Sequence, residues 1–216
     1  MLEKYMEEQS LVTTVLKKSL KNDKLVQAYL FSSDDIDYIY KYAKDFSKDI
    51  ISLSGLPSET LENIYKRIDK DEYTELKVVE PDGNTIKKSQ LIELQNSVST
   101  KPVEANKIIY IIKNCEKLNS SSANCILKFL EEPEDDIIAI LLTDNINMVL
   151  PTIKSRCQIL NFKNNNSNKM KNILFFVGLD ITDEDKEKFI HNSIDFLMNI
   201  EKYKINTMIK VKKLAY

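Results

Sequence analysis

The residues best suited to chemistry in this sequence are Ser155, Arg156 and Cys157, which follow one another directly. Arg156 and Arg67 are the only arginines among 31 basic residues, so the chain uses lysine almost everywhere else. A guanidinium is planar, permanently charged and able to bind a carboxylate or phosphate through two parallel hydrogen bonds, which lysine cannot do. This scarcity singles out Arg156 as a candidate, although composition alone favours a solvated surface arginine at a helix end.

Ser155 and Cys157 place a hydroxyl and a thiol beside this cation. A positive neighbour can lower the pKa of a cysteine, but a nucleophile also needs a base, and the only histidine is the distant His191. We expect Ser155 and Cys157 to set the end of a helix and its packing. The cysteines Cys115, Cys125 and Cys157 show no paired spacing, which fits a reducing compartment without disulfides.

Three further elements of sequence must position Arg156. Apolar residues recur at helical spacing from Ala123 to Leu130, and Pro133 ends that helix just after Glu131 and Glu132. The apolar run 137–143 predicts a strand buried on both faces, and a short helix ending in Arg156 follows it. Adjacent helical residues point about 100° apart, so Glu131 and Glu132 do not form an acid–base pair, and we expect a cap or interface role.

The remaining pattern indicates alternating strands and helices, which predicts a parallel sheet with helices on both faces. Expected strands are 27–31, 75–80 and 107–112, and expected helices include 9–22, 35–51 and 86–98. Residues 53–68 are expected to form a loop followed by a short helix. An Asn, Ser and Lys-rich linker at 163–169 precedes three helical stretches, 170–177, 183–200 and 206–214. We therefore expect a core domain at 1–163 and a helical domain at 164–216.

Composition limits the function classes. With 216 residues and 43% hydrophobic content the chain can bury a large core, and a net charge of −2 gives no overall attraction to nucleic acid. The acidic amino terminus has no apolar signal region, and no apolar run is long enough for a membrane span, so we expect a soluble, cytoplasmic protein. No cysteine lies between 52 and 73, which excludes a four-cysteine zinc module there.

Two motifs together indicate a family. The segments Ile126-Leu-Lys-Phe-Leu-Glu-Glu-Pro133 and Thr152-Ile-Lys-Ser-Arg-Cys157, on either side of a buried strand, resemble those that flank the fourth strand in the AAA+ clamp-loader family of bacterial DNA polymerase III. The resemblance implies an α/β AAA+ (P-loop NTPase-like) core at 1–163 with a small helical lid at 164–216. The helical collar that forms the family's third region has no counterpart in these residues.

The nucleotide motifs of that family are missing here. Where the family carries its phosphate-binding loop, this sequence has Ser32-Ser-Asp-Asp-Ile36, without glycine and with two acidic residues. Where the family carries its Walker B acids, this sequence has Lys113 and Asn114, and a lysine cannot ligate Mg²⁺. Two independent losses predict a degenerate core that holds no nucleotide cofactor and no metal and has no catalytic activity of its own.

The resemblance implies that Arg156 acts as an arginine finger in trans, stabilising the γ-phosphoryl group of ATP held with Mg²⁺ by a neighbouring motor subunit. The expected partners are that motor, the clamp-opening subunit and, through the complex, the sliding clamp and primed DNA. Thr143 is similar in position to a phosphate sensor, but we expect it to be structural. Lys128 and the lysines at 113 and 117 either face DNA or are simply solvated.

Two alternatives stay open from the sequence. The chain could be an active ATPase of the same fold that binds nucleotide through an unusual loop. It could also be a DNA-binding adaptor without ATPase partners, although its nearly neutral net charge argues against this.

Overall fold

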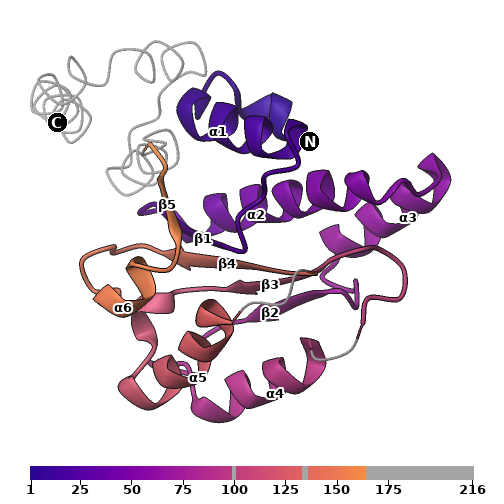
Figure 1. Ribbon diagram of the computed structural model, residues 1–216. Helices are drawn as coiled ribbons and strands as arrows, with labels where there is room; N and C mark the ends of the chain where they lie inside the picture. Colours follow the sequence, from indigo (N-terminus) through magenta and orange to yellow (C-terminus); the bar gives the residue numbers. More distant parts are fainter. Residues whose placement is uncertain (99–100, 133–135, 164–216) are drawn as a thin grey trace, which may run out of the picture. The chain divides into compact units, whose positions relative to one another are not determined.

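The computed structural model describes residues 1–98, 101–132 and 136–163, which belong to one compact unit, Met1–Asn164 (Figure 1). A parallel five-stranded sheet with the order β2-β3-β4-β1-β5 forms its centre. The strands are β1 (Ala28–Ser32), β2 (Leu76–Val79), β3 (Ile108–Ile112), β4 (Ile137–Thr143) and β5 (Gln158–Asn161). The predicted parallel sheet is confirmed.

Helices cover both faces of the sheet, as expected (Figure 1). On one face lie α1 (Ser10–Lys21), α2 (Ile36–Ile51) and α3 (Ser58–Asp69), and on the other lie α4 (Lys88–Val98) and α5 (Ser120–Glu131). The short helix α6 (Pro151–Lys154) follows β4. Single turns of 3-10 helix occupy Leu2–Tyr5, Ser52–Ser54 and Cys115–Lys117.

Strand β4 is apolar along nearly its whole length because helices cover both of its faces. All seven of its residues are buried. Because successive side chains point to opposite faces of a strand, Ile138, Ile140 and Leu142 join the core under α1 to α3, and the alternate residues join the core under α4 and α5. Each fully buried aliphatic side chain contributes about 1.5–3 kcal/mol of apolar transfer free energy.

Strand β5 was not predicted from the sequence. It has four residues, of which only Leu160 is buried, so it carries too little apolar pattern to be recognised. It nevertheless pairs with β1 in parallel, with Tyr29 opposite Gln158 and Ser32 opposite Asn161. Its start at Gln158 determines where the preceding Arg156 lies.

The proposed linker and lid, 164–216, lie outside the described residues, as does His191. Within the part that is described, no helix is long and apolar enough to cross a membrane.

Asp45 of α2 forms a buried ion pair with Lys48 on the same helix and is bound by two residues of the amino terminus. The side chains of Asp45 and Lys48 are 5% and 6% exposed, with 3.3 Å between Lys48 Nζ and Asp45 Oδ1. The Tyr5 hydroxyl donates to Asp45 Oδ2 at 2.6 Å, and Lys4 Nζ lies 2.7 Å from the same oxygen. Burial alone would raise the pKa of Asp45, but the hydrogen bonds from Lys4 and Tyr5 outweigh it and hold that pKa below its usual value.

We predict that Asp45→Asn lowers the free energy of unfolding at pH 7 by about 3 kcal/mol, because Lys48 loses a buried partner. A carboxyl whose pKa is depressed by folding stabilises the protein above its unfolded pKa of about 3.9, and this contribution disappears as the pH falls through the folded value. Urea unfolding should therefore show the two proteins converging below about pH 4.

The matched control is Asp69→Asn, since Asp69 also pairs with Lys48 but its side chain is 62% exposed. This change should cost less than about 1 kcal/mol. If the two variants lowered the free energy of unfolding equally, burial of the contact between Asp45 and Lys48 would not explain the effect.

Candidate functional site around Arg156

Arg156 lies in the turn between α6 and β5, which corrects the expectation that a helix ends on it. Helix α6 ends at Lys154 with Ser155 as its C-cap, and the Arg156 amide donates to the Ile153 carbonyl at 3.0 Å. The helix stops there because the chain must turn to enter β5 at Gln158. Arg156 is consequently presented on a tight turn between two short elements that the sheet anchors.

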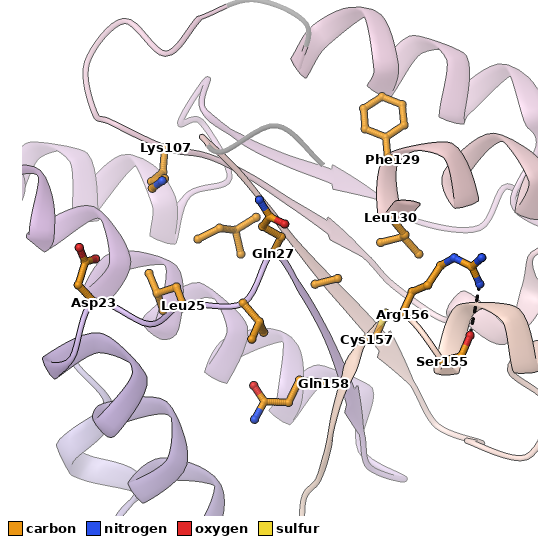
Figure 2. A pocket seen from close by; sticks show the side chains of 13 residues that line it. Asp23, Leu25, Gln27, Lys107, Phe129, Leu130, Ser155, Arg156, Cys157 and Gln158 are labelled. Atoms are coloured by element: carbon orange, nitrogen blue, oxygen red, sulfur yellow. Dashed lines mark hydrogen bonds between the residues drawn. The ribbon is translucent and has the colours of Figure 1, made fainter. Parts of the chain in front are cut away.

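The turn opens onto a cavity of about 720 Å³ at the amino-terminal edge of the sheet (Figure 2). Gln27 and Ala28 at the start of β1, Lys107 just before β3 and Gln158 at the start of β5 contribute to its wall. Apolar side chains supply much of the remainder, namely Leu25, Val26, Phe129, Leu130 and Ile138. A permanent cation thus stands beside a partly apolar cavity that is open to solvent.

The guanidinium of Arg156 joins the two motifs that the sequence singled out. Its Nη2 donates to Glu131 Oε1 at 2.5 Å, from the last residue of α5. Its Nη1 donates to the Thr152 carbonyl at 2.9 Å. The same nitrogen donates to Ser155 Oγ at 3.3 Å (Figure 2). The side chains of Arg156 and Glu131 are 32% and 48% exposed, so the pair remains accessible to solvent.

The opposite, carboxyl-terminal edge of the sheet is organised differently. Only three residues, Ser33 to Asp35, connect β1 to α2, and the Asp35 carboxylate accepts the Tyr38 amide at 2.9 Å. The Ser33 hydroxyl accepts the Asp35 amide at 3.2 Å. A helix amino terminus offers free N–H groups that can bind phosphate, but here a carboxylate of the chain itself occupies that place.

Beyond β3, Lys113 is bound within the protein. Its Nζ lies 3.0 Å from Glu80 Oε2, after β2, and 4.4 Å from the centre of the Tyr40 ring. Only 17% of the Lys113 side chain is exposed. Asn114 adopts a left-handed conformation with φ of 51° and begins the next turn. The ammonium group of Lys113 is therefore held in place at the carboxyl-terminal end of β3.

Thr143, at the end of β4, is fully buried and engaged in local contacts. Its hydroxyl donates to Glu116 Oε2 at 2.7 Å and accepts the Asn145 amide at 3.1 Å, and its carbonyl accepts the Ser33 amide. These bonds hold the ends of neighbouring segments together, in line with the structural role expected for Thr143. Lys128, by contrast, is exposed on α5.

Sequence reasoning found Arg156 and its flanking residues but missed the contact between Arg156 and Glu131. The side chain of Ser155 lies at the cavity, and its hydroxyl donates to the Thr152 carbonyl at 3.0 Å. Cys157 also lines the cavity, where burial raises the pKa of its thiol to about 12. Glu131 and Glu132 were visible in the sequence as two adjacent acids. Their spacing alone, however, cannot show which of them contacts Arg156.

The fold of this chain is similar to that of a known protein. A DNA polymerase III gamma subunit-related protein from Thermotoga maritima aligns with 88% of this chain and 57% of its own, with a TM-score of 0.57 and 20% identity. The fold is therefore that of an AAA+ (P-loop NTPase-like) core, as the sequence predicted.

Sequence comparison identifies the family within this class. The model of the family described as DNA polymerase III, delta subunit matches residues 8–166, and this chain belongs to that family. DNA polymerase III subunit delta' of Bacillus subtilis is 38% identical over 154 residues, which are 70% of this chain and 46% of that protein. DNA polymerase III subunit tau/gamma of Haemophilus influenzae is 31% identical over 149 residues, 68% of this chain and 21% of that protein. The chain thus spans less than half the length of these two relatives.

We predict that the Cys157 thiol is unreactive at neutral pH, because only the thiolate attacks alkylating agents. In the folded chain at pH 8, iodoacetamide should modify Cys157 at least about 100-fold more slowly than in urea. Mass spectrometry of the peptides after timed quenching measures both rates. Rapid alkylation of the folded protein would mean that Arg156 activates the thiol.

Proposed function

We propose that this chain is a clamp-loader subunit of DNA polymerase III that binds no nucleotide itself and supplies Arg156 to ATP bound by a neighbouring subunit. The observation that carries the proposal is the position of Arg156 at the amino-terminal edge of a parallel sheet. Family membership supports the subunit role, because its relatives are named as subunits of that polymerase.

The direction of the strands explains why the arginine would act on another molecule. In open α/β sheets, ligands bind beyond the carboxyl ends of the strands. Arg156 lies at the other end, and the seven residues of β4 separate the two edges by roughly 20 Å. An arginine side chain cannot cover that distance, so a phosphoryl group that it stabilises must belong to a partner.

The chain's own carboxyl-terminal edge supports the absence of nucleotide. A Walker A loop needs glycines and a Lys-Ser/Thr pair, whereas Ser33 to Asp35 is too short and is closed by the Asp35 cap. Lys113 sets a cation where Mg²⁺ would need acidic ligands. We therefore assign no cofactor and no metal to this chain.

The proposal implies a particular setting. In the assembled loader the chain would contact a motor ATPase subunit and the clamp-opening subunit, and would reach the sliding clamp and primed DNA through the complex. ATP hydrolysis would then be a property of the complex, to which this chain contributes one arginine. A complex that acts in DNA replication would work in the cytoplasm.

We predict that Arg156→Ala in the full-length protein, assembled with its partners, slows hydrolysis at the neighbouring ATP site by about 10³-fold or more, the range measured for arginine fingers. Arg156→Lys should recover only a small part of this rate, because an ammonium cannot form the two-pronged contact. Single-turnover hydrolysis of ATP by the reconstituted loader measures the effect on one site.

Arg67→Ala is the matched control. Its side chain is 36% exposed and paired with Glu104, so this change also removes a half-exposed, ion-paired arginine. Hydrolysis should be unaffected by it. Unchanged hydrolysis in a fully assembled Arg156→Ala loader would disprove the role in trans.

A further inference from the structure

We propose that Glu131 is a positioning residue for Arg156, which holds the guanidinium ready for the phosphoryl group of a neighbouring subunit's nucleotide. The inference rests on the function proposed above and extends it to a second residue. It is based on the 2.5 Å contact between Arg156 Nη2 and Glu131 Oε1, which links the end of α5 to the turn before β5.

The hydrogen bonds of Arg156 do not use all of its N–H groups. Of its five N–H groups, Nη1 uses two on Thr152 and Ser155, and Nη2 uses one on Glu131. Within residues 1–98, 101–132 and 136–163, no acceptor meets the Nε–H or the second N–H of Nη2. These groups can serve a phosphate oxygen while the other contacts persist.

The anchoring of Glu131 makes it suitable for this task. It follows directly on Leu130, which is buried against the sheet, so the last turn of α5 is fixed. A free arginine side chain samples many rotamers, and holding it in one orientation before the partner arrives removes that entropic cost from the transition state. Thr152 and Ser155 restrain Nη1 of the guanidinium, and Glu131 restrains Nη2.

The partial exposure of Arg156 and Glu131 indicates that the ion pair orients the arginine without binding it too tightly to be released. With 32% and 48% of the two side chains exposed, water screens the attraction, and ion pairs of this kind are weak. A transferring γ-phosphoryl group carries more charge than one carboxylate and can compete for the guanidinium. Glu131 therefore orients Arg156 without withholding it.

Glu132 provides a matched control in the next position. It is the C-cap of α5, with φ of −126° and ψ of 65°, and it is exposed, and none of the described residues donates a side-chain hydrogen bond to it. Glu131→Ala and Glu132→Ala remove the same charge from the same helix end, so a difference between them reports the contact with Arg156 alone.

The experiment measures steady-state ATP hydrolysis by the full-length loader carrying Glu131→Ala, Glu131→Gln or Glu132→Ala. We expect Glu131→Ala to lower kcat by about 10- to 100-fold, because a misplaced catalytic group loses that much. The KM for ATP should not change, since the neighbour binds the nucleotide. Glu131→Gln should recover much of the rate through its amide oxygen, and Glu132→Ala should match the unaltered loader.

A second comparison separates this inference from the function on which it rests. In the Arg156→Ala background, Glu131→Ala should cause no further loss, because its effect passes through the arginine. If Arg156→Ala is slow but Glu131→Ala is as fast as the unaltered loader, or faster, the positioning role is overturned and the role of Arg156 stands. If Arg156→Ala has no effect, both are overturned.

Discussion

The parallel pairing of β5 with β1 is the constraint on which the site depends. Because β5 runs in the same direction as β1, its start at Gln158 lies at the amino-terminal edge of the sheet, and the turn before it must lie there as well. An antiparallel β5 would have placed Arg156 beside Asp35 and Thr143 at the other edge. Four residues of weakly apolar strand therefore decide at which edge of the sheet the arginine lies.

Polar groups at the carboxyl-terminal edge of the same sheet are mostly paired within the chain, although Glu116 Oε1 is buried there and meets no hydrogen-bond partner among the described residues. Asp35 caps α2, Lys113 pairs with Glu80, and Thr143 binds Glu116. Buried and half-buried polar groups need partners to avoid a desolvation penalty, and these three contacts supply them within the chain. The two edges thus differ in a consistent way: one is closed by internal contacts, and the other presents a cation beside a cavity.

Much of this could be predicted from the sequence, for identifiable reasons. Residues 137–143 form a long apolar run, so β4 was found with its observed bounds, and Asp35 precedes a strongly amphipathic segment, so α2 was found nearly complete. Strand β5 was missed because only Leu160 is buried in it, and α6 ends before Arg156 because the chain has to turn into that strand. The contact of Glu131 with Arg156 joins residues 25 positions apart, and local periodicity carries no information on such pairs.

The central claim is that this chain holds no nucleotide of its own, which leaves Arg156 to serve a neighbour's. The most direct measurement is a calorimetric titration of ATP with Mg²⁺ into the isolated chain. The account predicts no saturable heat, because a carboxylate already occupies the amino terminus of α2 and a lysine stands at the metal position. A saturable, Mg²⁺-dependent heat with one site per chain would contradict it.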